Sequence, residues 1–207
     1  MGKTVGNIDL NNMSISPKYR VKHWTTARNS NDWTLSTNIF YDRIESRYLK
    51  PVRYIASDKE IGEFSGFSIL AIDCLIIETL NQFYKGSDET EGAHWKAFWY
   101  VFKNSPHFKP SFSGKKAKTF YEHFRCGILH QAQTKASSLV RINRPKMVEE
   151  VNPKEISDGL IVDREKFHEA LENEIDDYKQ KLISGAPEHK KLRDNFIKKM
   201  NFICKSE

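Results

Sequence analysis

The sequence predicts a mainly α-helical protein, a helical bundle with a small β-hairpin insertion. Apolar residues recur at helical spacing in several separate stretches, which is the pattern of helices that bury one face. One stretch, Phe67 to Leu80, is apolar on nearly all sides and predicts a central, buried helix. Between residues 139 and 162 the helical period stops, and prolines separate short runs that suit β-strands.

The composition indicates a folded protein with a basic surface. The 207 residues suffice for one domain with appendages and for a sizeable core. A formal net charge of +6 favours polyanionic partners, nucleic acid first among them. The three cysteines, Cys74, Cys126 and Cys204, cannot all pair within one chain and lack metal-ligand spacing, which fits a reducing cytoplasm.

Neither export nor membrane insertion is expected. The chain opens on no charged-then-apolar leader. Its longest apolar run contains Asp73 and Glu78 and is too short for a bilayer. We therefore expect a cytoplasmic protein without membrane contact.

The first 35 residues differ from the rest in composition and in hydrophobic periodicity. Residues 1–35 are rich in Asn, Ser, Thr and basic residues and lack a sustained period, so we expect a partly ordered arm. Trp24 and Trp33 are candidates for holding this arm against the body. A single helical domain then fills residues 36–207, with the hairpin insertion at about 139–162.

Two long helices are expected at the start of the domain. The first covers about residues 37–57, and Pro51 kinks or ends it. The second, at about 60–85, contains the central apolar run and stops at Gly86.

Shorter elements follow the central helix. Aromatic residues at helical spacing over residues 92–104 predict a short helix that packs in the core. A hairpin is expected around the Asp158-Gly159 turn. Asp163 then caps an amphipathic helix that Gly185 ends.

The last helix opens at Pro187 and has a basic face. That face is either a solvated surface or a surface that contacts RNA. Its basic residues are Lys190, Lys191, Arg193, Lys198 and Lys199.

The stretch from Phe120 to Lys135 contains the residues best suited to chemistry. Arg125 and His130 are five positions apart, so on an unbroken helix they lie about 140° apart around the axis. Gly127 predicts a helix break or a close backbone approach, and a break lets Arg125 and His130 flank one cleft. Guanidinium clamps phosphate oxygens and imidazole moves a proton near neutral pH, so the pair suits phosphate chemistry.

Other interpretations of these residues use different atoms. A helix that runs straight through Gly127 would place His123, Cys126 and His130 on one stripe that could bind zinc. Cys126 could also be a nucleophile served by His130. In a purely structural role, Arg125 forms a salt bridge inside the bundle and His130 is a satisfied core or interface histidine. Because the stripe lacks a fourth ligand nearby, we expect no metal and no other cofactor.

The Arg-x-x-x-x-His element of Arg125 and His130, preceded by Tyr121 and Phe124, resembles the motif of the HEPN superfamily. The resemblance also rests on the long apolar helix before the motif and on overall helicity, over roughly residues 36–205. It implies a helical bundle that dimerises, with two motif copies facing each other in a metal-independent ribonuclease site. Many members are toxins or effectors of anti-phage defence, so RNA, a second copy of the chain and an antitoxin or sensor protein are the implied partners.

The resemblance and the residues themselves suggest roles for individual side chains. Arg125 and His130 are the implied catalytic pair, which cleaves RNA through attack by its 2′-hydroxyl. Supporting roles are expected for Glu78, Tyr121, Cys126 and Gln131. The nearest lysines, expected to contact RNA, are Lys115, Lys116, Lys118 and Lys135.

Two positions depart from the family pattern. Members often carry Asn or Asp after the arginine, where this chain has Cys126. Some place a tyrosine two residues beyond the histidine for nucleotide modification, and Ala132 stands there instead, which argues against that control. The alternative function is a non-catalytic helical module that binds RNA, nucleotide or a partner protein.

Buried carboxylates of the central helix need partners. Glu78 either holds Arg125 or orients His130. Alternatively, Asp73 and Glu78 both emerge where the helix meets solvent.

Overall fold

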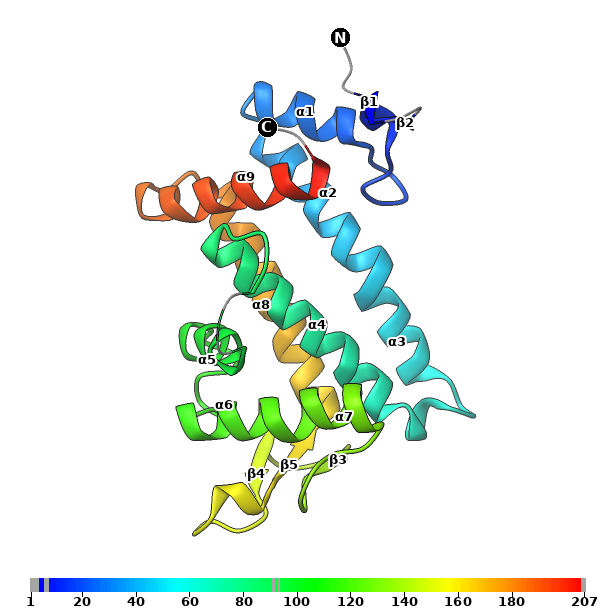
Figure 1. Ribbon diagram of the computed structural model, residues 1–207, viewed down its shortest axis with the longest axis vertical. Coiled ribbons are helices and arrows are strands. Elements are labelled where there is room, and N and C mark those ends of the chain that lie inside the picture. The colour runs from blue at the N-terminus through cyan, green and yellow to red at the C-terminus, as the bar shows by residue number, and fades with distance from the viewer. Residues whose placement is uncertain (1–3, 6–7, 91, 93, 206–207) are drawn as a thin grey trace. The chain divides into compact units, whose positions relative to one another are not determined.

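The protein is mainly α-helical, with a small three-stranded sheet (Figure 1). The computed structural model describes residues 4–5, 8–90, 92 and 94–205. The prediction of a mainly helical fold with a small β element is therefore confirmed.

The helices and strands follow one another along the chain with these bounds. The α-helices are α1 (Val21–Asn29), α2 (Trp33–Ile44), α3 (Lys50–Ser57), α4 (Gly66–Lys85), α5 (Trp95–Asn104), α6 (Gly114–Phe120), α7 (Cys126–Gln131), α8 (Arg164–Ile183) and α9 (Lys190–Cys204). The strands are β1 (Thr4–Val5), β2 (Ile8–Asp9), β3 (Leu139–Arg141), β4 (Val148–Glu150) and β5 (Leu160–Asp163). Two π turns, Glu45–Leu49 and Tyr121–Arg125, connect α2 to α3 and α6 to α7.

The chain forms two compact units. The terminal unit comprises residues 1–51, 82–89 and 176–207, and the central unit comprises residues 52–81 and 90–175. The division into an arm over residues 1–35 and one domain over residues 36–207 stays a prediction.

The core of the terminal unit is aromatic. Phe40 is fully buried, with ring centroids 4.8 Å from Phe83 and 5.9 Å from Phe196. Trp24 is fully buried against Phe196, and its indole N–H donates to Asn201 Oδ1 at 3.0 Å. Trp24 lies on α1, a helix that the sequence analysis did not predict.

The central unit has its own aromatic core, which gathers side chains from α5, the loop after it, α6, the π turn and α8. The rings of Phe102 and Phe112 stack at 4.0 Å, and those of Phe120 and Phe167 at 4.9 Å. The fully buried rings of this core are Phe98, Phe102, Phe108, Phe120, Phe124 and Phe167. The prediction that the aromatic helix after residue 92 packs in the core is confirmed.

The ends of the long helices match their sequence signals. Gly86 has a φ of +67° and ends α4, and Gly185, with a φ of +68°, follows α8. Asp163 Oδ1 accepts the N–H groups of Glu165 and Lys166, both at 3.0 Å, so the predicted cap of α8 is confirmed. Pro187 begins a 3₁₀ turn that leads into α9.

Pro51 does not end the first long helix. The chain stays helical from α2 through the π turn into α3, and Pro51 is the second residue of α3. In the π turn the N–H of Lys50 donates to the carbonyl of Glu45, five residues back. Since a proline ring crowds the carbonyl four residues before it, the wider turn directly before Pro51 gives that ring room.

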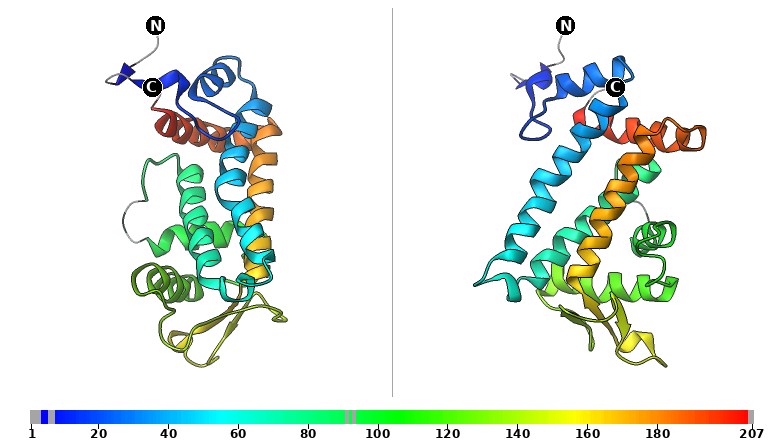
Figure 2. Two further views of the ribbon diagram at one scale, coloured as in Figure 1. Left: turned by 90° about the vertical axis from the view of Figure 1, so that its right-hand side faces the viewer. Right: turned by 180° about the vertical axis from the view of Figure 1, so that it is seen from behind.

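The predicted hairpin is part of a larger sheet. β4 pairs antiparallel with β5, as expected, but the connection is long and contains a 3₁₀ turn, Ile156–Asp158, before Gly159. Gly159 has a φ of +143°, and a Cβ there would lie 2.8 Å from the backbone nitrogen of Ser138. β3, which was not predicted, adds a parallel strand on the other side of β5. The sheet lies beside the N-terminal end of α8, the helix that directly follows β5 (Figures 1 and 2).

Helix α4 is the central helix that the sequence predicted. Ile69, Leu70, Cys74, Ile76 and Ile77 are buried along it. By length and composition alone, α4 could cross a membrane, but a little over half of its apolar stretch is buried inside the described fold, and buried core helices pass the same test.

Replacing Phe40 with alanine tests the terminal core. Phe40→Ala should lower the free energy of unfolding by about 3–5 kcal/mol, because the cavity cannot collapse fully among the surrounding rings. Phe202→Ala, at a half-exposed position on α9, is the control and should cost about 1 kcal/mol or less. Denaturant titrations measure both, and equal losses would contradict this account of the core.

Candidate functional site

The predicted motif lies on one uninterrupted helical segment from Gly114 to Gln131 (Figure 1). α6 passes into the π turn Tyr121–Arg125, where the N–H of Cys126 donates to the carbonyl of Tyr121, and then into α7. The predicted helix break at Gly127 is therefore wrong, because Gly127 lies inside α7. The helix changes geometry just before that glycine, at the π turn.

Gly127 serves a close backbone approach instead, which was the other part of the expectation. A Cβ at Gly127 would lie 2.5 Å from the carbonyl oxygen of Gln133 and 3.2 Å from the nitrogen of Lys135. Ala132, with a φ of +53°, ends α7 and turns the chain back along the helix. The N–H of Lys135 then donates to the carbonyl of His123 at 3.1 Å. Glycine is required because the returning loop leaves no room for a side chain.

Arg125 is held by Glu78 of helix α4. Arg125 Nε donates to Glu78 Oε1 at 2.8 Å, and Nη2 lies 3.5 Å from Oε2. Burial lowers the pKa of Arg125, but the hydrogen bond and charge of Glu78 outweigh it and leave the pKa above its ordinary value. The expectation that Glu78 pairs with Arg125 is confirmed, and Glu78 does not simply emerge into solvent.

Tyr121 covers the guanidinium group of Arg125 from another side. The ring centroid of Tyr121 lies 5.6 Å from Arg125 Cζ. Burial and a hydrogen bond with Cys126 raise the pKa of Tyr121 to about 12. Tyr121 is therefore a neutral hydroxyl at physiological pH. Tyr121 and Arg125 are four residues apart, a spacing that places both side chains on the same side of the helical segment.

His130 and Gln131 are exposed at the end of α7. His130 thus differs from Arg125, which is half-buried and fixed by its ion pair. Without the expected break, Arg125 and His130 lie five positions apart on a continuous helical segment, about 140° apart around its axis, so the predicted shared cleft within one chain is not formed. Arg125 is clamped to the core, and His130 is at the surface.

The zinc stripe is not assembled. His123 Nδ1 lies 2.9 Å from Ser138 Oγ, and Cys126 is half-buried beside Tyr121. Within the described ranges, His123, Cys126 and His130 do not form a group close enough to hold one ion.

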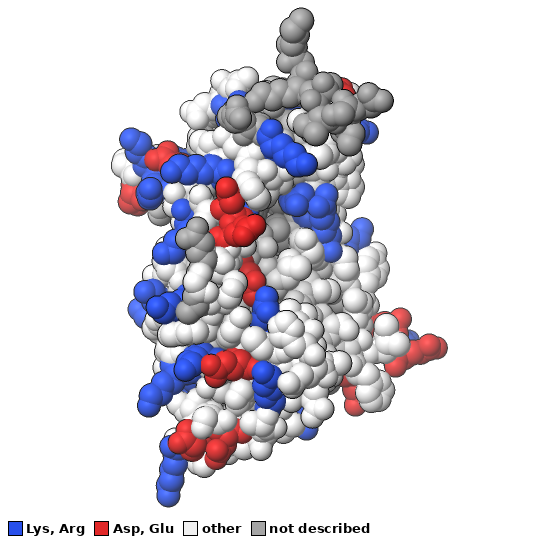
Figure 3. All heavy atoms as spheres, viewed as in Figure 1, with Lys and Arg blue, Asp and Glu red and all other residues white. Residues whose placement is uncertain are grey.

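The four lysines expected to contact RNA differ in their surroundings. Lys115 is exposed, and Lys135 is half-buried beside Gly127. Lys116 Nζ forms an ion pair with Glu150 at 2.7 Å, and Lys118 Nζ lies 3.8 Å from Glu122. On the face shown in Figure 3, basic side chains are interspersed with acidic ones. Contact between these lysines and RNA stays a prediction.

The central unit contains a second charged cluster, around Asp73. The sequence indicates that Asp73 needs a partner but does not identify that partner. Asp73, for which the sequence requires a partner, is fully buried, and its Oδ1 lies 2.7 Å from His168 Nδ1 on α8. His168 Nε2 lies 3.5 Å from Glu172, which forms an ion pair with Arg53. His168 and Glu172 are four residues apart on α8, a spacing that marks one helix face, but sequence alone does not show that this face meets Asp73.

Both pKa values of the buried pair are raised. Burial raises the pKa of Asp73, and the hydrogen bond and charge of His168 oppose the shift only in part. Burial lowers the pKa of His168, but the hydrogen bond and charge of Asp73 outweigh it, so the pKa lies above its ordinary value of 6.5. Both shifts make the folded state bind protons more tightly than the unfolded chain does.

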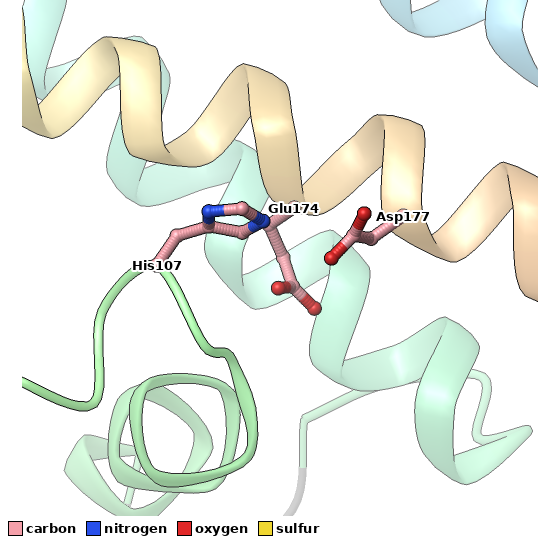
Figure 4. A group of neighbouring side chains, drawn as sticks. All are labelled: His107, Glu174 and Asp177. Carbon is pink, nitrogen blue, oxygen red and sulfur yellow. The ribbon is translucent and has the colours of Figure 1, made fainter.

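His107 and Glu174 are neighbours in the central unit (Figure 4). His107 lies in the loop after α5, and its ring points toward Glu174 on α8, with ligating atoms within 4.8 Å of each other. Asp177 lies one turn further along α8, in the part of the helix that belongs to the terminal unit. Two ligands do not make a metal site, and the expected absence of a cofactor stays a prediction.

The raised pKa of His168 predicts a pH dependence of stability. Protonated His168 stabilises the fold fully below its unfolded pKa, and this contribution is lost as pH rises through the raised folded pKa. The difference in unfolding free energy between wild type and His168→Gln should therefore shrink as pH rises above 6.5, the ordinary pKa of histidine. Urea titrations measure this difference, and His189→Gln is the control. A difference that grows with pH would contradict the assignment.

Comparison with models of known protein families, with curated proteins and with solved structures gives no match. Inference about function therefore starts from the site itself. Its features are a guanidinium group fixed by Glu78 and Tyr121, a neighbouring π turn and an exposed histidine at the end of the same helix.

Proposed function

We propose that this protein is a metal-independent endoribonuclease of the HEPN type, in which His130 transfers the proton and Arg125 stabilises the phosphate. The observation that carries the proposal is the arrangement of the motif helix. Arg125 is fixed by Glu78, and His130 is exposed at the end of the same helix. A cytoplasmic toxin or anti-phage effector, controlled by an antitoxin or a sensor protein, is the role that this activity fits.

His130 is suited to the proton transfer that RNA cleavage requires. Its imidazole removes the proton of the ribose 2′-hydroxyl, and the resulting oxygen attacks the adjacent phosphorus. The bond from phosphorus to the 5′-oxygen breaks, and that oxygen takes up a proton from an imidazolium group. The products are a 2′,3′-cyclic phosphate and a 5′-hydroxyl. RNA supplies the nucleophile, so the protein needs to supply only acid-base and electrostatic catalysis.

Arg125 is suited to stabilise the charge that grows on the phosphate. Glu78 occupies Nε and Nη2, which leaves Nη1 for a phosphate oxygen among the contacts of the described residues. About a fifth of the side chain is exposed, so the group reaches the surface from a fixed position. A donor that is already oriented does not have to reorganise when the transition state forms.

The π turn supports a functional reading of this helix. π turns are rare because they interrupt the regular hydrogen bonding of an α-helix. Those that occur are frequently found at functional sites. This one spans Tyr121–Arg125, and the ring centroid of Tyr121 lies 5.6 Å from Arg125 Cζ. Glu78 and Tyr121 together restrict the rotation of Arg125.

The exposed apolar residues near the motif favour a homodimer. Leu75 lies on α4, one turn before Glu78, and Leu129 lies directly before His130, and both side chains are exposed. Contact between an exposed leucine and water is unfavourable. A second copy of the chain that packs on α4 would bury the side chain of Leu75. A two-fold axis there would also bring two motifs together.

A non-catalytic helical module is the second candidate function, and one observation favours it. The ion pair with Glu78 gives Arg125 a complete structural role inside the central unit. In this interpretation the exposed end of α7 binds RNA, nucleotide or a partner protein without cleavage.

Cleavage assays with purified protein and single-stranded RNA test the proposal. In the presence of a chelator, His130→Ala should lower the cleavage rate by roughly 10²- to 10⁴-fold, because positioned proton transfer is worth about that much. Arg125→Lys should be nearly as impaired as Arg125→Ala, since an ammonium group lacks the guanidinium fork. His189→Ala, in the terminal unit, is the control and should cleave at the wild-type rate.

The substrate provides a second control for the same assay. An RNA with 2′-O-methyl groups and a DNA of the same sequence should both remain intact, because neither has a free 2′-hydroxyl. Wild-type activity in His130→Ala, or cleavage of DNA, would refute the mechanism. RNA binding without cleavage would support the non-catalytic module.

Sedimentation of charge variants tests the dimer. Leu75→Glu and Leu129→Glu should each convert a dimer at micromolar concentration into a monomer and should reduce cleavage together with dimerisation. Val151→Glu, at another exposed apolar position of the central unit, is the control and should leave the dimer intact. A wild-type monomer with full cleavage activity would exclude this dimer.

A further inference from the structure

A cavity in the central unit lies beside the first residues of α4. It is a cavity of about 360 Å³ between the start of α4, strand β3 and the start of α8. Its walls include two arginines, Arg141 and Arg164, and two aromatic side chains, Phe64 and Phe67. None of these four residues belongs to the motif helix.

Arg164 is the most unusual group in this cavity. Its residue is only 4% exposed, and Nη2 donates to the carbonyl of Gly62 at 2.6 Å. Within the described part of the chain, the buried Nε and Nη1 atoms have no hydrogen-bond acceptor. A buried guanidinium group is costly unless an anion or acceptors satisfy it, so this position calls for a negatively charged partner.

The start of α4 adds a positive field at the same place. α4 has 20 residues, and the first N–H groups of a helix have no acceptor within the helix. The helix start and Arg164 are adjacent, since a Cβ on Gly66 would lie 3.5 Å from Arg164 Nη1 and 2.8 Å from Val140 Cγ1. A buried cation and the positive end of a helix repel each other. An anion bound between them is attracted by both, so the electrostatic energy of the site becomes favourable.

The rim of the cavity has an apolar side. Phe64 is 82% exposed and lies just before α4, and Phe67 is 37% exposed and is the second residue of α4, the most apolar helix. The charged side chains in the walls are two arginines and Glu63, which leaves one net positive charge. A ligand that fits these walls has an anionic group at the inner end and an apolar, flat group at the rim.

We propose that this cavity binds a small phosphate monoester. The phosphate group accepts hydrogen bonds from Arg164 Nε and Nη1 and from the first N–H groups of α4. Arg141 adds a second positive charge, and the organic part of the ligand lies against Phe64 and Phe67. A phosphate monoester suits the site better than a carboxylate because it has three terminal oxygens to share between a guanidinium fork and a helix start.

Titration calorimetry with the full chain tests this site, with phenyl phosphate as the probe. Phenyl phosphate should bind in a saturable manner and more tightly than inorganic phosphate, and phenol should not bind measurably. Arg164→Gln should weaken the binding of phenyl phosphate by roughly tenfold or more, the usual effect of losing a charge-assisted hydrogen bond. Arg47→Gln, which removes an exposed arginine of the terminal unit, is the control and should bind as the wild type does.

Two variants at exposed positions keep the test decisive if Arg164→Gln does not fold. Arg141→Gln should weaken both phenyl phosphate and inorganic phosphate several-fold. Phe67→Ser should weaken phenyl phosphate but leave inorganic phosphate unchanged, because it removes only the apolar wall. Failure of the wild type to bind phenyl phosphate would overturn the proposal, as would wild-type affinity in both Arg141→Gln and Phe67→Ser. RNA cleavage by His130 has no part in this outcome, so the two proposals fail independently.

Discussion

Helix α4 carries two carboxylates into the interior of the central unit, and the placement of its other helices depends on how they are neutralised. Asp73 is fully buried and requires His168 of α8, while Glu78 requires Arg125 of the motif helix. The helix is otherwise among the most apolar parts of the chain, so an unpaired carboxylate would cost several kcal/mol, on the order of the whole stability of a domain. Hydrophobic burial alone would allow α8 and the motif helix to slide along α4, and the two ion pairs fix their positions.

The same constraint connects the core to the candidate active site. Arg125 forms an ion pair with Glu78, which is its structural role, and is proposed to bind phosphate, which is its chemical role. The two are compatible because a guanidinium group presents donors on more than one edge. A lysine in this position could neutralise Glu78 but could not also offer a fixed second edge. The site is thus built on the same ion pair that orders the unit.

Much of this architecture can be predicted from local sequence signals. Asp163 as a cap, Gly86 as a stop and the apolar run of α4 act through neighbouring residues, and each is where the sequence indicates. Contacts between segments that are far apart in the chain leave little trace in the sequence. Nothing local connects Asp73 to His168, and β3 forms a strand only because β5 lies beside it. At Gly127 the sequence predicts a break or a close backbone approach and cannot separate the two, because the carbonyl that excludes a side chain there belongs to a loop six residues later.

The π turn before Cys126 also divides the motif helix into two rotational phases. A regular α-helix advances by about 100° per residue, so one additional residue in a turn rotates everything after it by roughly that angle. The segment before the π turn is oriented by Phe120, which stacks in the aromatic core. The segment after it is oriented by Gly127, against which the returning loop rests. One helix therefore meets two packing requirements that a uniform helix of this sequence could not meet together. The orientation of the first segment therefore depends on the packing of Phe120, whereas that of the second, which bears His130, depends on the fit of the loop against Gly127.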